Sequence, residues 1–181
     1  MKLTKLVVIG LLMITGYAYA GGYASVEYYD EHNRASGADN IKEALVVGTK
    51  DNGMDYSIKM ENSQTSFGSG SISQGLELRA KKSFDMFYLG GRLGEKVTSS
   101  EHFSHYAIDA GVKFPLVAGL KADIGGRYRN AFETSHNFET TRAHMALGYD
   151  LTKQDSVAVR WSRSWGDEEK DAWRLQYTRS F

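Results

Sequence analysis

The stretch from Asp171 to Phe181, which reads D-A-W-R-L-Q-Y-T-R-S-F, decides the fold. Successive side chains of an extended strand point to opposite faces, so the residues of this stretch divide into two sets. The apolar set is Trp173, Leu175, Tyr177 and Phe181, and the other set is Ala172, Arg174, Gln176, Thr178 and Ser180. The alternation predicts a β-strand whose apolar face lies against either a protein core or lipid.

The first twenty residues have the three regions of a secretory signal peptide. Lys2 and Lys5 provide a positive start, residues 6–14 form an apolar run, and Ala18-Tyr19-Ala20 provides small residues for cleavage. The apolar run is well short of the roughly 20 residues that a membrane-spanning helix needs. We therefore expect residues 1–20 to be a cleaved signal peptide and residues 21–181 to be the exported domain.

The composition suits a protein that crosses a membrane as strands. The mean hydropathy is −0.43, and no segment after the signal peptide is as long and apolar as a membrane helix. A closed barrel of alternating strands satisfies every backbone group in a bilayer with only half of its strand residues apolar. Loss of Lys2 and Lys5 reduces 22 basic residues to 20, against 22 acidic ones, which gives no support for a nucleic-acid partner. The absence of cysteine excludes disulfides and thiolate metal sites.

Ten segments with this alternation predict an all-β, antiparallel, up-and-down transmembrane barrel of about ten strands, with eight or twelve as alternatives. The segments are 23–29, 41–49, 54–61, 72–80, 86–93, 105–114, 120–129, 142–150, 156–165 and 171–181. Short turns are expected at about 50–53, 81–83, 115–118 and 152–155, and longer loops at about 31–40, 62–71, 94–104, 130–137 and 166–170. Outer-membrane barrels have short periplasmic turns and longer extracellular loops, so both termini are expected on the periplasmic side.

Three local features sharpen this prediction. Asn52-Gly53 is a signal for a type I′ hairpin turn, since both residues tolerate positive φ. Pro115 is expected to end the sixth strand because it has no N–H for the ladder. The segment 41–49 has no settled phase: if Leu45 faces lipid, so does Glu43, which suggests a reversed phase or a β-bulge.

Aromatic residues are expected to form girdles at both ends of the apolar faces, as in outer-membrane barrels. The outer set is Tyr28, Tyr106, Tyr128, Trp165 and Trp173, and the inner set is Phe87, Phe114, Tyr149 and Phe181. A soluble β-sandwich would explain the alternation equally well. It explains less easily the two aromatic sets or the many charges that its enclosed face would carry.

The inward faces carry ten basic and seven acidic residues. The basic residues include a ladder from the last four strands, Arg127, Arg129, Arg142, Arg160 and Arg174, together with Lys59, Arg79, Arg92, Lys113 and Lys121. The acidic residues include a wall from the first four strands, Glu27, Asp55, Glu61 and Glu77, together with Asp109, Asp123 and Asp150. Closing the last strand on the first brings the ladder and the wall together.

This lumen has two interpretations. An arginine ladder that faces carboxylates would favour small anionic solutes, because the guanidinium fork binds carboxylate or phosphate through two hydrogen bonds. The alternative is a non-conducting interior filled with salt bridges, since barrels of about eight strands are barely wide enough for their own side chains.

The closing strand resembles the last strand of bacterial outer-membrane β-barrels, which ends in Phe after alternating apolar residues, although Arg179 departs from that pattern. G-R-Y-R at 126–129 and R-L-Q-Y-T-R-S-F at the end resemble small outer-membrane porins, loosely the oligogalacturonate-specific family. The resemblance implies insertion by the barrel-assembly machinery through the strand ending at Phe181. It also implies an outer-membrane location among lipid and lipopolysaccharide, and contacts between the arginine ladder and acidic oligosaccharides. That family's barrels have about twelve strands, more than the ten expected here.

Two other classes of function are an enzyme embedded in the barrel and a structural barrel. A barrel-embedded hydrolase needs a base beside a nucleophile or water, and His105, Asp109 and His144 are the inward candidates. They belong to no recognisable catalytic motif, so we predict no enzyme, no catalytic residue, no metal and no cofactor. A structural barrel that binds lipopolysaccharide or a protein partner is the third class, with Arg163 on the lipid face reaching for lipid phosphates.

Overall fold

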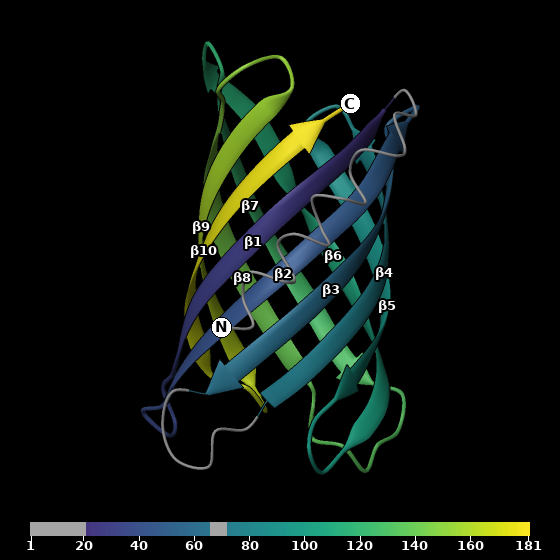
Figure 1. The fold of residues 1–181 in the computed structure, drawn as a ribbon, viewed down its shortest axis with the longest axis vertical. Helices are drawn as coiled ribbons and strands as arrows, with labels where there is room; N and C mark the ends of the chain where they lie inside the picture. Colours follow the sequence, from purple (N-terminus) through teal and green to yellow (C-terminus); the bar gives the residue numbers. More distant parts are fainter. Residues whose placement is uncertain (1–20, 66–71) are drawn as a thin grey trace, which may run out of the picture.

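A computed structural model describes residues 21–65 and 72–181 and shows a closed antiparallel barrel of ten strands (Figure 1). Each strand pairs with the next, and the last pairs with the first. The strands are β1 Gly22–Asn33, β2 Asp39–Asp51, β3 Met54–Thr65, β4 Ile72–Phe84, β5 Phe87–Val97, β6 His102–Val117, β7 Leu120–Ala131, β8 Thr140–Asp150, β9 Asp155–Gly166 and β10 Lys170–Ser180. The expected number and order of strands are confirmed. The predicted signal peptide lies outside the described residues and stays a prediction.

The outer face of the barrel is apolar. Large hydrophobic side chains are exposed on every strand, among them Ile58, Leu78, Ile108, Ile124, Leu147 and Leu175. Water-soluble proteins rarely expose a continuous apolar patch larger than a few hundred Å², so this belt faces lipid and the soluble sandwich is wrong. Trp173 and Phe87, from the two predicted aromatic girdles, are both well exposed on the outer face. No helix in the described ranges is long and apolar enough to cross a membrane.

The strands run further than predicted at the end with the longer connections, which lies at the bottom of Figure 1. Glu31 was expected in a loop, but β1 continues to Asn33 and Glu31 is almost completely buried inside the barrel. The expected loop at 94–104 is reduced to residues 98–101. Beyond the apolar belt both faces of a strand are polar, so the alternation that reveals a strand disappears there.

The turns at the opposite end are tight. Asn52 and Gly53 have φ values of 48° and 74°, as the predicted type I′ turn requires. The prediction that Pro115 ends its strand is wrong. Strand β6 continues to Val117, and its pairing with β7 shifts register between Pro115 and Val117. The irregularity accommodates a residue that lacks an N–H.

Strand β2 has a continuous register with both neighbours, so neither the reversed phase nor the bulge occurs. Leu45 pairs with Val26 and Met60 on the outer face, and Glu43 lies on the same face. The neighbours of Glu43 are Tyr28 and Asn62. The carboxylate is tolerated because it lies at the end of the strand where the outer face becomes polar.

Candidate functional site: the charged lumen

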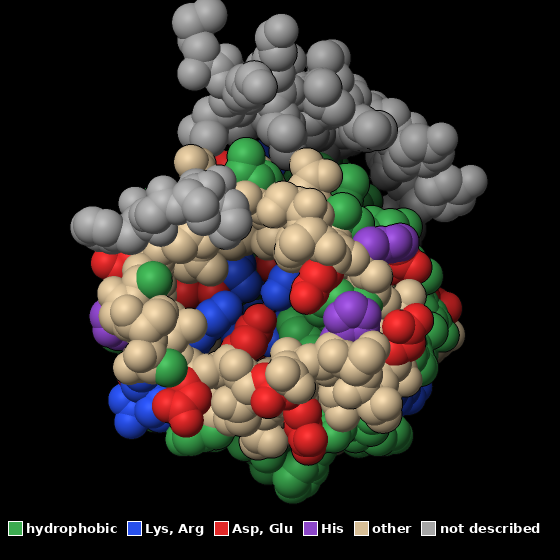
Figure 2. All heavy atoms as spheres, turned by 90° about the horizontal axis from the view of Figure 1, so that it is seen from below, with side chains coloured by type: hydrophobic (Ala, Val, Ile, Leu, Met, Phe, Trp, Pro, Cys, Tyr) green, Lys and Arg blue, Asp and Glu red, His purple; other side chains and the backbone are tan. Residues whose placement is uncertain are grey.

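The inner face of the barrel has more basic than acidic side chains. All ten basic and seven acidic residues predicted to face inward do so. The register adds Lys42, Lys50, Lys81, Lys96 and Lys170, and it adds Glu31 and the connecting residue Glu168. The described lumen therefore holds fifteen basic and nine acidic side chains. Viewed from the end with the longer connections, charged side chains of both signs lie in a central hollow (Figure 2).

A belt of ion pairs crosses the middle of the lumen. Its first part centres on Glu27, whose side chain is 2% exposed. Arg174 lies 2.9 Å from one carboxylate oxygen of Glu27, and Lys59 lies 3.5 Å from the other. Tyr29 donates a hydrogen bond to Glu27 and accepts one from Lys59 at 2.9 Å. Charges this far from bulk water are stable only when paired in this way.

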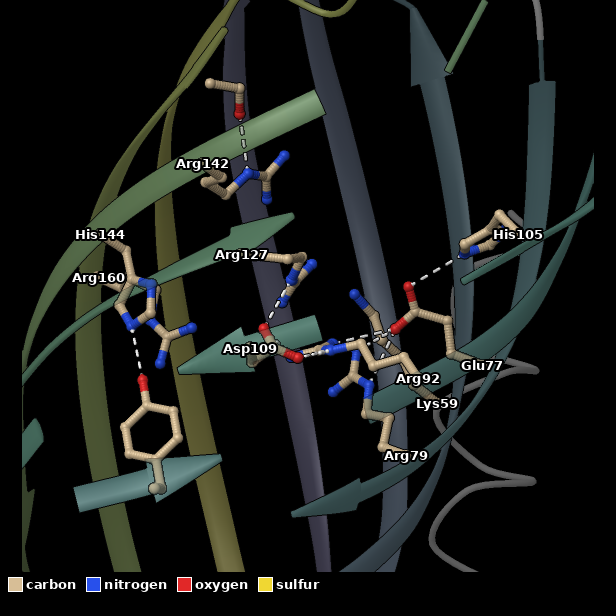
Figure 3. Close-up of polar contacts among 12 residues, drawn as sticks. Lys59, Glu77, Arg79, Arg92, His105, Asp109, Arg127, Arg142, His144 and Arg160 are labelled. Atoms are coloured by element: carbon tan, nitrogen blue, oxygen red, sulfur yellow. Dashed lines mark hydrogen bonds and ion pairs between the residues drawn. The ribbon is translucent and has the colours of Figure 1, made fainter. Parts of the chain in front are cut away.

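The second part of the belt comes from β4, β5, β6 and β7. Glu77 accepts hydrogen bonds from Arg79 at 2.8 Å and from Arg92 at 3.1 Å. Arg92 and Arg127 both bind Asp109, with Arg127 Nε at 2.8 Å (Figure 3). We call the two parts together the central belt: Glu27, Lys59, Glu61, Glu77, Arg79, Arg92, Asp109, Arg127 and Arg174.

The predicted arginine ladder faces inward, but its partners are mostly not the predicted acidic wall. Of the ladder only Arg174 binds a wall residue, Glu27. The other contacts are Arg127 to Asp109, Arg129 to Glu168 at 2.7 Å, Arg160 to Asp123 at 3.0 Å, and Arg142 to the Ser164 hydroxyl at 2.8 Å. Residues on adjacent strands are closer than residues across the lumen, so most pairs form locally. Among the described residues, Arg142 is the ladder member without a carboxylate partner.

Two connections fold back over the lumen at the end with the longer connections, which we call the extracellular half after the orientation expected from the sequence. Phe138, from residues 132–139, is 2% exposed, stacks edge-on with Phe103 at 4.8 Å, and lies 3.7 Å from the Arg129 guanidinium. Glu168, from residues 167–169, binds Arg129, Lys96 at 3.3 Å and Lys170 at 3.4 Å. We call Phe138 and Glu168 the outer plug. The cavity that Phe138 and Arg129 line at this end is only about 50 Å³.

The outer plug depends on the charge of Glu168. Burial by itself would raise the pKa of this carboxyl, but attraction by Arg129, Lys170 and Lys96 outweighs burial and holds the pKa well below its ordinary value. The carboxylate is therefore ionised at neutral pH. Glu168 was expected in the loop at about 166–170, and no role was expected for Phe138. Phe138 is one of two aromatic residues, with Phe132, in an otherwise polar connection, and this was the signal available in the sequence.

The half at the end with the short turns, which we call the periplasmic half after the same expected orientation, is open by comparison. A cavity of about 490 Å³, which we call the periplasmic vestibule, reaches from the central belt to the short turns. Nine basic and six acidic residues line it. The predicted wall residue Asp55 lies here and binds Lys81 at 3.5 Å and the Tyr23 hydroxyl at 2.7 Å. The vestibule is lined mainly by polar and charged side chains, with more basic than acidic residues.

Two glycines shape the wall between the vestibule and the belt. A Cβ on Gly111 or Gly125 would lie about 2.5 Å or 2.4 Å from the Tyr88 hydroxyl oxygen. Only glycine therefore allows Tyr88 to lie across β6 and β7, where its hydroxyl contacts Asp123 at 3.0 Å and His144 Nε2 at 3.2 Å. The ring is held in place as part of the lumen wall.

The other candidate residues have structural partners. His105 Nε2 lies 3.6 Å from Glu77 and His144 Nε2 lies 3.2 Å from Asp123, whereas Asp109 is bound by two arginines. Arg163, expected to reach for lipid phosphates, makes two hydrogen bonds to Asp171 at 2.7 Å and 2.9 Å.

Comparison with solved structures finds β-barrels of bacterial outer membranes. The translocator domain of the autotransporter NalP from Neisseria meningitidis has a TM-score of 0.58 and 7% identity, over 99% of this chain and 95% of that one. An outer membrane channel from Pseudomonas putida F1 has a TM-score of 0.56 and 10% identity, over 91% and 97%. The NanC porin has a TM-score of 0.50 and 9% identity, over 86% and 100%. No family model and no curated protein matches the sequence. At identities this low, the structural similarity shows a shared fold and nothing more. The chain is an outer-membrane-type β-barrel, as its closing strand predicted.

Proposed function

We propose that this protein is a narrow, porin-like channel of the bacterial outer membrane that favours small anionic solutes. The observation that carries the proposal is the enclosed polar lumen, in which fifteen basic side chains outnumber nine acidic ones inside a lipid-facing barrel. An excess of fixed positive charge in a low-dielectric wall concentrates anions and repels cations. The vestibule supplies room for a hydrated solute on the periplasmic side.

The central belt is the constriction in this proposal. Its ion pairs leave several arginine donors unused, and a guanidinium can exchange one oxygen partner for another without losing charge. A passing anion would move between such donors. Acidic oligosaccharides as the solute, with the five ladder arginines as their contacts, stay a prediction from the sequence resemblance.

The proposed setting is the outer membrane, among lipid and lipopolysaccharide. Strand β10 closes the barrel against β1, and the Phe181 N–H bonds to the Gly22 carbonyl at 2.9 Å. Barrel closure thus depends on the last strand, which supports our proposal that the barrel-assembly machinery recognises the strand that ends at Phe181.

Single-channel recording in planar bilayers tests the channel. In a KCl gradient, the reversal potential of the wild type is expected to indicate anion selectivity. The variant Arg142→Ala removes a lumen cation that has no carboxylate partner, so it is expected to reduce the selectivity while the barrel still folds. Arg163→Ala is the matched control, since Arg163 lies on the outer face. Cation selectivity in the wild type would overturn the proposal.

A second candidate is a non-conducting structural barrel, which the paired central belt and the outer plug favour. This candidate predicts no current from the wild type and none after the plug is removed. The channel proposal predicts current in both cases, with more current after removal. Silence of both proteins, when both are shown to be folded and inserted, would replace the channel with the structural barrel.

A further inference from the structure

One group of cations in the periplasmic vestibule lacks enough negative partners. Lys113 lines the vestibule, and among the described residues no carboxylate lies within ion-pairing distance of it. Lys81, Lys50 and Arg160 all repel it, and the attraction that it receives comes from Asp123. Asp123 is already bound by Arg160 at 3.0 Å. Lys81 is likewise paired with Asp55, so the group holds more positive than negative charge and Lys113 is left without an ion-pair partner of its own.

Arg160, which belongs to this group, and Arg174 beside it have unused hydrogen-bond donors. Arg160 and Arg174 lie directly opposite each other on β9 and β10, and both line the vestibule. Each directs one terminal nitrogen to a carboxylate, Arg160 to Asp123 and Arg174 to Glu27. The Nε atom of each is buried without a hydrogen-bond partner. A buried donor without a partner costs free energy, about 1–3 kcal/mol, that a ligand oxygen would recover.

We propose that the vestibule is a binding site for a compact, multivalent oxyanion of the phosphate class, held by Lys113, Arg160 and Arg174. These donors come from β6, β9 and β10, so they approach from different parts of the wall. A ligand with several terminal oxygens and at least two negative charges uses such donors better than a monocarboxylate, and charge-assisted bonds to guanidinium are strong. The inference deepens the proposed function, because it names a ligand class for the same cationic lumen.

The site makes a paired prediction about stability and binding. Removal of the Lys113 charge relieves the repulsion within the group, so the unliganded Lys113→Gln barrel is expected to be as stable as the wild type or more stable. The same change removes a ligand contact, so pyrophosphate is expected to stabilise the variant less than the wild type, because binding to the folded state adds to stability by mass action. A residue with a purely structural role would not separate the two effects in this way.

Isothermal titration of the folded barrel in uncharged detergent, with sodium pyrophosphate at constant ionic strength, measures the binding. We expect saturable binding at one site, weakened about tenfold or more in Lys113→Gln, which corresponds to about 1.4 kcal/mol. Lys82→Gln is the control, since it removes the same charge from the outer face at the same end of the barrel. Lower mobility after boiling than before it, on a denaturing gel, confirms that each variant is folded.

Several results would overturn the site. Pyrophosphate that does not bind saturably, or that binds Lys113→Gln and Lys82→Gln with the affinity of the wild type, contradicts it. Citrate that binds more tightly than pyrophosphate at the same ionic strength contradicts the phosphate class. The channel is judged separately: a barrel that binds pyrophosphate but passes no current refutes the channel and keeps the site, and a barrel that conducts without binding does the reverse.

Discussion

The two halves of the lumen are built from the same ten strands but differ in how they are filled. The extracellular half is narrowed by Phe138 and Glu168, and the cavity beside Phe138 is only about 50 Å³. The periplasmic half holds a cavity of about 490 Å³ and a cationic wall. The central belt separates them. A barrel of this width is thus neither an open pore nor a solid plug along its whole length.

The difference follows from the connections at the two ends. The periplasmic turns at 52–53, 85–86 and 118–119 are too short to fold back into the lumen. The connection at 132–139 is long enough to carry Phe138 inward, and residues 167–169 carry Glu168 to three cations from neighbouring strands. Length alone does not decide which half of the lumen is filled, because the three residues 167–169 reach inward whereas the four-residue turn 151–154 at the other end leaves the vestibule open.

The largest effect is expected in the belt that divides the two halves. Glu27→Ala leaves Arg174 without its carboxylate, whereas Lys59 keeps Glu61, and breaking a buried ion pair costs about 3–5 kcal/mol. The free energy of unfolding in urea, with the barrel in lipid vesicles, measures the loss. Glu43→Ala is the control, because Glu43 faces outward and has no place in the belt. Equal losses in the two variants would mean that the belt is no more dehydrated than the outer rim.

The next effect concerns the outer plug. Phe138→Ala removes a buried ring, which costs about 3 kcal/mol at the low end of the range for such changes. This loss of free energy destabilises the packed position of the connection 132–139 and leaves the strands of the barrel intact. The lumen is less obstructed as a result, so single-channel conductance is expected to rise. Phe132→Ala is the matched control, since Phe132 belongs to the same connection but is 58% exposed. Unchanged conductance in Phe138→Ala would show that the plug does not limit the passage of ions.

A smaller effect depends on pH. The folded-state pKa of Glu168 lies below that of an unfolded carboxyl, so its contribution to closing the plug is complete above the ordinary Glu pKa of about 4.3 and is lost as the pH falls through the lower, folded value. Conductance is expected to rise only in that acidic range. Glu168→Gln should conduct at neutral pH as the wild type does in acid. The lost charge-assisted hydrogen bonds should destabilise the closed position of the connection by about 1.5–3 kcal/mol.

Glu133→Gln controls for this pH dependence, because Glu133 lies in the connection of Phe138 with a side chain that is 76% exposed. Its conductance should follow the pH dependence of the wild type. Two results would show that Glu168 does not close the plug. One is a wild-type conductance that already rises as the pH falls from 7 to 5, and the other is a Glu168→Gln variant whose conductance still rises in acid as the wild type's does.

The fold could be predicted from the sequence because alternation is a local property. The stretch 171–181 shows it with one break, at Arg179, and a barrel is the closed form that such strands require in lipid. The alternation failed at Glu31, where both faces of the strand are polar, and it gave no phase around Glu43, where the outer face leaves the apolar belt.

The candidate site was predictable only in part, for a related reason. The alternation of side chains along each strand correctly placed Arg127 and Arg160 inside the barrel. The alternation does not say which carboxylate lies nearest to each arginine. That choice depends on the register between strands, which brings Asp109 opposite Arg127. The contact of Arg129 with Glu168 depends also on the path of the connection 167–169. That path cannot be predicted from the sequence, because the connection has no periodic pattern.

The smallest effect is expected in the periplasmic half of the lumen, at its rim. Lys121 and Asp150 form an ion pair at the periplasmic rim, with side chains 48% and 40% exposed. Exposed pairs contribute about 0.2–1 kcal/mol and are screened by salt, so Asp150→Ala is expected to change the free energy of unfolding by no more than this, and by less at high ionic strength. A loss as large as that of Glu27→Ala would mean that water does not reach the vestibule. The periplasmic half would then be as dry as the central belt, and solute binding there would have to displace buried ion pairs rather than water.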